Sequence, residues 1–174
     1  MSMMDFHLYL IFMLERNYFG INIKNLIKLY RIRKGNAPVN YLISDNGEER
    51  ILPVMNVKHA LFLNDQKKTS MQKTEIGVCV PTLVEIESPI PDLHIHRMGI
   101  IVDFVIGLQQ IPPDDFIDLE SKETIQKENQ ILVNKACIIA HCNVPIVNTE
   151  NHVLEVPVHL IHVENLFMYG VQSR

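Results

Sequence analysis

Residues 8–14 place leucine or phenylalanine at every second position, which is the period of a β-strand with one face against a core. The polar residues Glu15–Asn17 then turn the chain, and Tyr18–Ile23 returns as a second strand. After Asn22 the spacing changes to Ile23, Leu26, Ile27 and Tyr30, the i, i+3, i+4, i+7 pattern of one helix face. The pattern therefore predicts a hairpin followed by a short helix.

A second strand pair is predicted where Tyr41–Ile43 and Ile51–Met55 flank Ser44–Gly47, because Asn-Gly is a strong hairpin-turn signal. The polar stretch 64–75 that follows is expected to be a solvated loop. Apolar segments at 76–86, 93–108, 131–142, 144–147 and 153–161 predict further strands, separated by turn residues. Residues 118–130 predict an exposed helix or a loop, and residues 163–167 a helical turn.

The most informative segment is Met98–Leu108, a nearly continuous apolar run broken by Asp103. Such a run is typical of a strand buried on both faces. An unpaired buried carboxylate is costly, so we expect Asp103 to accept backbone hydrogen bonds or to reach solvent rather than to act as a catalytic acid. Short strands at this spacing with little helix predict closed sheets or barrels.

Composition narrows the possible functions. With 174 residues, 47% hydrophobic and 21% charged, the chain suits one globular domain with a sizeable core. The net charge of −4 supplies no basic surface for phosphates, which argues against a nucleic-acid partner. The apolar start at 8–14 is too short to span a bilayer, so we expect no membrane insertion. The three cysteines are sparse and odd in number, which favours a reduced, cytoplasmic protein.

Four blocks, in order, resemble CheW-like domains, the bacterial chemotaxis coupling modules that join receptors to the histidine kinase CheA. Gly99–Val105 is similar to the family's Gly-hydrophobic-Val-Val-Asp-x-Val segment, and 10–23 is similar to its opening strands. Pro38 with 52–57 resembles the family's Pro and Val-Pro-Val-x-Asp-Leu, and 158–167 its last strand and closing helix. The resemblance covers roughly residues 9–167.

The resemblance implies a mainly β fold: two small five-stranded β-barrels sharing a core, with short helices after the second strand and at the C-terminus. It implies one CheW-like domain over 1–174, with two barrel subdomains connected near 58–76. The implied function is a non-catalytic adaptor that couples chemoreceptors to a CheA-type histidine kinase. The implied partners are the kinase's regulatory domain and the receptor's cytoplasmic tip. The resemblance implies no enzyme activity, cofactor or metal site for this chain. The residues expected to contact partners are Leu26, Lys28, Glu48, Val54 and Asn56.

Two of these positions depart from the family pattern. Glu48 stands where the family has the arginine of its Asn-Leu-Arg-Gly block, and Lys28 stands where it has a glutamate. Because both charges are reversed, we hypothesise that Lys28 and Glu48 form the family's ion pair with its signs exchanged. A reversed pattern repels a partner built for the usual one, so it favours a specialised receptor or kinase.

Other chemistry has weaker support. His94 and His96 share one face of a predicted strand, so the alternative function is a small β-barrel that binds a ligand or a metal through a histidine-rich face. Cys142 follows His141, but neighbours on a strand point to opposite sides, which is the wrong geometry for a thiol and its base. We expect the cysteines to be core or surface thiols.

Overall fold

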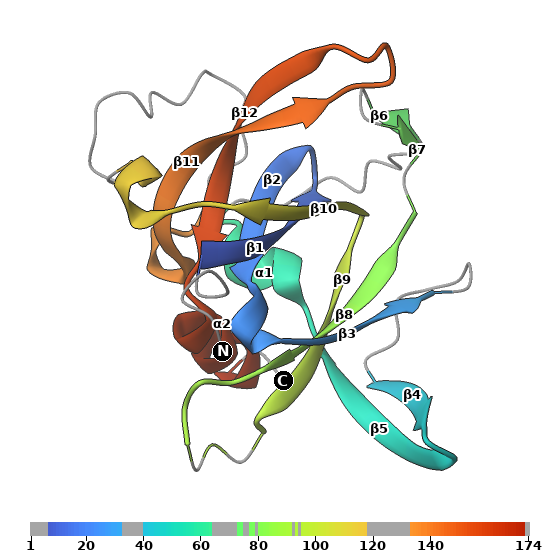
Figure 1. Ribbon diagram of the computed structural model, residues 1–174. Helices are drawn as coiled ribbons and strands as arrows, with labels where there is room; N and C mark the ends of the chain where they lie inside the picture. Colours follow the sequence, from blue (N-terminus) through green and yellow to red (C-terminus); the bar gives the residue numbers. More distant parts are fainter. Residues whose placement is uncertain are drawn as a thin grey trace.

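Two curled five-stranded sheets, each built from strands far apart in the sequence, frame the protein (Figure 1). The computed structural model describes residues 7–32, 40–63, 73–74, 77–78, 80–91, 93, 95–117 and 133–172. The first sheet has the order β10-β1-β2-β12-β11: β1 is Leu8–Leu14, β2 Asn17–Asn22, β10 Phe104–Gln110, β11 Ile138–Val147 and β12 Val153–Ile161. The second has the order β3-β8-β9-β5-β4: β3 is Leu26–Arg31, β4 Asn40–Asp45, β5 Glu48–Met55, β8 Thr82–Glu87 and β9 Arg97–Val102. The predicted mainly β architecture with two five-stranded units is confirmed.

The helices and the remaining strands are short. They are the 3₁₀ helices η2 (Ile23–Asn25), η3 (Pro113–Asp115) and η4 (Lys135–Cys137), the α-helices α1 (Val57–Leu61) and α2 (Val163–Gln172), and the strand pair β6 (Lys73–Thr74) and β7 (Gly77–Val78). The C-terminal helix was predicted and α1 was not. The predicted connection near 58–76 therefore begins with a helix. Residues 118–130, Cys79 and His94 lie outside the described residues.

Both predicted hairpins form, and their turns have the backbone that the sequence requires. Asn46 and Gly47 have φ angles of 51° and 82°, as a two-residue turn of type I′ needs. Glu15 and Arg16 also have positive φ angles, 47° and 64°, although neither is glycine. Positive φ angles are uncommon for residues other than glycine, so the Glu15–Arg16 turn needs support from its surroundings.

The predicted helix after Asn22 is largely wrong. Asn22 does cap a helix, since its side chain accepts a hydrogen bond from Lys24 N–H, but that helix is the single 3₁₀ turn η2. From Leu26 the chain is strand β3, and the register against β8 shifts between Leu26 and Lys28. The bulge inserts Ile27 and breaks the period of two, which produces a spacing that imitates a helix.

The apolar run 98–108 is two strands in different sheets. β9 lies between β8 and β5 in the second sheet, whereas β10 forms an edge of the first. Asp103 sits at the bend between them. Burial on both faces therefore holds for β9, where Met98, Ile100 and Val102 are fully buried on one face, and Gly99 is buried and Ile101 half-buried on the other. It does not hold for β10, where Leu108 is 56% exposed.

A shared core joins the sheets. Phe12 and Phe19 of the first sheet stack on each other with ring centroids 6.0 Å apart, and Phe19 also meets Phe62 after α1. Ile86 and Ile100 of the second sheet belong to the same buried cluster, as do residues of both α-helices. Two smaller clusters fill the inner faces of the first and second sheets.

Candidate functional site

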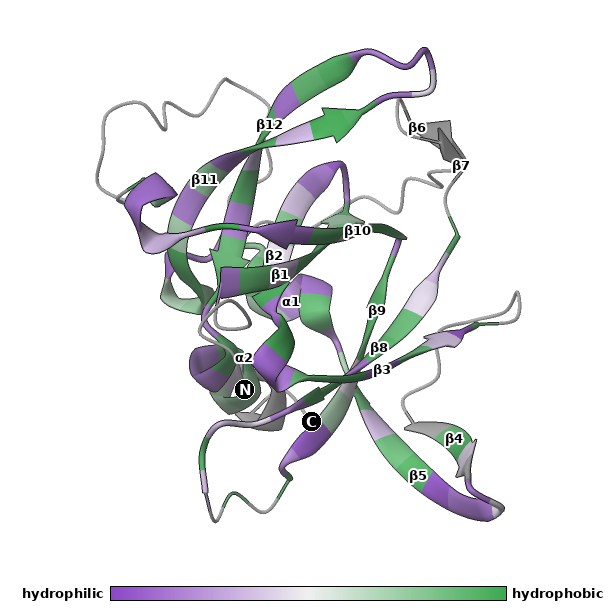
Figure 2. Ribbon diagram, viewed as in Figure 1, coloured by the Kyte–Doolittle hydropathy of each residue, from purple (hydrophilic) through white to green (hydrophobic). Residues whose placement is uncertain are grey.

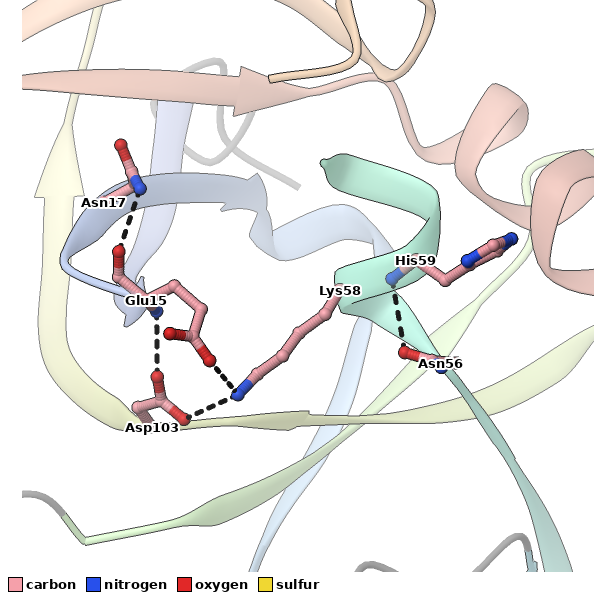
Figure 3. Close-up of polar contacts among 6 residues, drawn as sticks. All are labelled: Glu15, Asn17, Asn56, Lys58, His59 and Asp103. Carbon is pink, nitrogen blue, oxygen red and sulfur yellow. Dashed lines mark hydrogen bonds and ion pairs between the residues drawn. The ribbon is translucent and has the colours of Figure 1, made fainter. Parts of the chain in front are cut away.

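Three charged side chains meet where the two sheets join (Figure 3). Asp103 comes from the bend between β9 and β10, Glu15 from the β1–β2 turn, and Lys58 from α1. Asp103 Oδ2 accepts a hydrogen bond of 2.9 Å from the Glu15 backbone N–H. Lys58 Nζ lies 2.5 Å from Glu15 Oε1 and 3.7 Å from Asp103 Oδ1. The expectation that Asp103 caps a backbone donor is confirmed, and the cluster ties both sheets to α1.

Neighbouring asparagines position this junction. Asn17 Nδ2 donates to the Glu15 carbonyl over 2.9 Å, which helps to hold the turn whose φ angles are positive. Asn56 caps α1 by accepting a hydrogen bond of 3.2 Å from His59 N–H, and Lys58 lies in the first turn of that helix. Asn56 was predicted to contact a partner, and it has a structural role in the folded chain as well.

A second charged cluster lies in the second sheet. Glu85 of β8 is fully buried, and Arg50 Nη2 lies 2.7 Å from each of its carboxylate oxygens. The Tyr30 hydroxyl of β3 donates to Glu85 Oε1 over 2.8 Å. A buried carboxylate needs such partners to offset its lost hydration. This cluster links strands β3, β8 and β5 across the sheet.

The predicted ion pair between Lys28 and Glu48 is wrong, because the ion pairs among the described residues do not include it. Strands β8 and β9 separate β3 from β5. Lys28 is exposed, and its ammonium lies over the Tyr30 ring, 5.4 Å from the centroid. Glu48 is exposed beside the β4–β5 turn, where it pairs with Asp45 in the ladder. The buried ion pair of this sheet uses Arg50 and Glu85 instead.

The five predicted partner-binding residues occupy different environments. Lys28, Glu48 and Asn56 are exposed, Leu26 is half-buried against the shared core, and Val54 is buried inside the second sheet. The structure thus leaves three of the five within direct reach of another molecule. Their contact with a partner stays a prediction.

Exposed apolar pairs on two hairpins were missed. Leu42 and Ile51 face each other across β4 and β5 and are 60% and 68% exposed. Val147 and Val153 also face each other, at the end of the β11–β12 hairpin, and both are exposed. Figure 2 shows hydrophobic residues within β5 and hydrophilic ones at its turn end. The alternation along β5 could have revealed Ile51, because it shares a face with Glu49 and not with the buried Leu52.

Two histidines form a pair that the sequence pattern did not single out. His141 and His159 lie opposite each other on β11 and β12, with their Nδ1 atoms 2.8 Å apart. One ring must donate and the other accept, so the accepting ring is neutral. Burial, and to a smaller extent the nearby His141, lower the pKa of His159 to about 4, and burial also lowers the pKa of His141.

The histidines and cysteines considered for metal binding and thiol chemistry lie in unsuitable surroundings where the structure describes them. His96 is exposed, and the part of the chain that the structure describes contains no group of three or more His, Cys, Asp and Glu side chains that could hold a metal ion. Cys137 and Cys142 are buried free thiols, and burial raises the pKa of each to about 11. Cys142 packs inside the first sheet, whereas the neighbouring His141 ring contacts His159. His141 therefore does not activate the thiol.

Comparison with known proteins supports the fold alone. No family model matches the chain, and no curated protein sequence matches it. Among solved structures, the crystal structure of scaffolding protein TtCheW from Thermoanaerobacter tengcongensis is similar, with a TM-score of 0.54 and 14% sequence identity. The match covers 92% of this chain and 87% of that one. The chain thus has a CheW-like fold.

None of the helices within the described ranges combines the length and the apolar character that a membrane-spanning helix needs.

Proposed function

We propose that this protein is a non-catalytic adaptor of the CheW type, which acts in the cytoplasm and couples chemoreceptors to a CheA-type histidine kinase. The observation that carries the proposal is the likeness in fold, over nearly the whole chain, to a protein described as a scaffold. A scaffold works by holding partners in place, so its function requires surfaces and no bond-making chemistry. Its proposed partners are the regulatory domain of the kinase and the cytoplasmic tip of a receptor.

The second sheet offers a surface suited to this role. Lys28 and Glu48 are exposed there, and neither is engaged in an ion pair among the described residues. Leu42 and Ile51 expose apolar area on the same β4–β5 hairpin as Glu48. Apolar area supplies affinity at interfaces, and charges at the rim supply specificity and association rate. The reversed charges at Lys28 and Glu48 favour a specialised partner over the usual one.

A binding measurement tests this proposal. The full chain should bind the regulatory domain of a CheA-type kinase, or a receptor tip from the same organism, at micromolar concentration in isothermal titration calorimetry. The double variant Lys28→Glu, Glu48→Arg restores the family's charges and should weaken binding to the specialised partner about tenfold, which is about 1.4 kcal/mol.

Glu155→Arg is the matched control, because Glu155 is an exposed acid on β12 of the other sheet, away from Lys28, Glu48 and the exposed pair Leu42 and Ile51. It should leave the affinity within about twofold. Failure of both partner classes to bind at micromolar concentration refutes the adaptor function.

A further inference from the structure

The two edge strands of the first sheet, β10 and β11, bound an open groove of about 380 Å³. Phe104 and 106–109 line it from β10, 144–147 line it from β11, and Ile11 contributes from β1. The sheet curls far enough to bring its edges near each other, but the two strands do not pair with each other.

A strand-like contact lies on the same edge of β11, outside the residues that line the groove. Ile117 forms an isolated antiparallel bridge with His141, with N–H to carbonyl distances of 2.6 and 3.0 Å. The backbone groups of His141 therefore point away from β12, and by the alternation of an antiparallel ladder so do those of Asn143, Pro145 and Val147. Beyond His141, none of the described residues pairs with this edge. The existing bridge shows that extended chain fits beside β11 at His141.

The other side of the groove is an open strand edge. Ile111 N–H donates to the His7 carbonyl over 2.7 Å, so Ile111, Gln109 and Gly107 turn their backbone groups toward β1. The N–H and C=O groups of Leu108 and Gln110 then face away from β1. No strand in the described part of the chain pairs with them. This edge can accept the hydrogen bonds of one more strand.

Proteins usually protect such edges with lysine, proline or inward-pointing charge. On β11, Pro145 removes one donor. Phe104–Gln110 has no charged residue and no proline, and its Leu108 side chain is 56% exposed. β10 has a bulge at Ile106, where its register with β1 shifts, but the segment beyond it, Gly107–Gln110, has no charged residue or proline and is the less protected edge of the pair.

We propose that the β10 edge binds an uncharged, extended segment of a partner protein, which adds to the first sheet as a strand beside β10. The lining of the groove carries no charged side chain, so it favours apolar side chains at alternate positions of the segment. This surface lies on the other sheet from Lys28 and Glu48, and the proposal does not depend on the proposed adaptor function.

Selection from random twelve-residue peptides displayed on phage, with the full chain as the target, provides the probe. The enriched peptides should alternate apolar with uncharged residues and lack proline at their centre. A synthetic copy of the strongest peptide should slow hydrogen exchange of the Leu108 and Gln110 amides at least tenfold. Leu108→Lys should weaken its binding at least tenfold.

Leu63→Lys is the matched control, because Leu63 is 65% exposed and does not line the groove. It should leave the affinity unchanged. The proposal is overturned if no peptide is enriched, if the bound peptide protects other amides, or if Leu108→Lys and Leu63→Lys behave alike. Protection of Leu108 and Gln110 by dimerisation of the chain alone, with no peptide effect, overturns it too, since the occupant would then be a second copy.

Discussion

Arg50→Met removes the cation that faces the fully buried carboxylate of Glu85. Breaking a buried ion pair by removing one partner typically costs about 3–5 kcal/mol, because the remaining charge is left buried. Arg50 is 32% exposed, so water reaches the site from its side, and we expect a loss near the lower limit, about 3 kcal/mol. In a domain of this size that corresponds to a fall of roughly 6–12 °C in the unfolding temperature.

Urea unfolding followed by circular dichroism measures this loss, and Lys28→Met is its matched control. Lys28 is the backbone ladder partner of Glu85 between β3 and β8, and its side chain is exposed. Lys28→Met removes one positive charge, as Arg50→Met does. We expect it to cost less than about 0.5 kcal/mol. The double variant Arg50→Met, Glu85→Leu should recover most of the stability, since it leaves no buried charge. Equal losses for Arg50→Met and Lys28→Met would refute the reasoning, because Glu85 would then not depend on Arg50.

Three further predictions concern the junction, the histidine pair and the thiols. Lys58→Met should cost about 1–3 kcal/mol in urea unfolding, because it removes the cation beside two partly buried carboxylates, one of them Asp103. Because burial lowers the pKa of His159 from 6.5 to about 4, the unfolded chain takes up its proton first as the pH falls. Neutral His159 therefore contributes fully to the stability of the fold above pH 6.5, and this contribution falls by up to roughly 3 kcal/mol as the pH reaches 4. In a plot of urea midpoint against pH, His159→Gln should flatten the part between these two pH values. Cys137 and Cys142, whose pKa values burial raises to about 11, should react with a thiol reagent at pH 8 only after unfolding, as counted by mass spectrometry.

Local patterns predicted the parts of the fold that are local in space. The Asn46-Gly47 turn and the hairpin at 8–22 each lie within a few residues of their signals, and both form. The segment after Asn22 was misread because one bulged residue, Ile27, makes a strand look like a helix face. The run at 98–108 was read as one strand because hydropathy does not show at which residue a chain passes from one sheet to another.

The charged site was harder to predict, because its partners are distant in the sequence. Glu85 and Arg50 are 35 positions apart, and Glu15 and Asp103 are 88 apart. No local spacing encodes such contacts. The signal that could have found Glu85 is the one that identified Asp103: an acid flanked by apolar residues in a strand, here between Val84 and Ile86. Applied to both acids, it predicts that each needs a donor or a cation from another element.

The partners of Glu85, which is buried, and of Asp103, which is partly buried, help to interpret the exposed charges. Glu85 is satisfied by Arg50 and Tyr30, and Asp103 by Glu15 N–H and Lys58, so the charges that the fold requires are already paired. Lys28 and Glu48 lie outside these pairs, and stability places little constraint on their sign. We infer that a change of sign at these two positions costs the fold little and alters mainly which partner the surface accepts, as expected of residues that determine specificity.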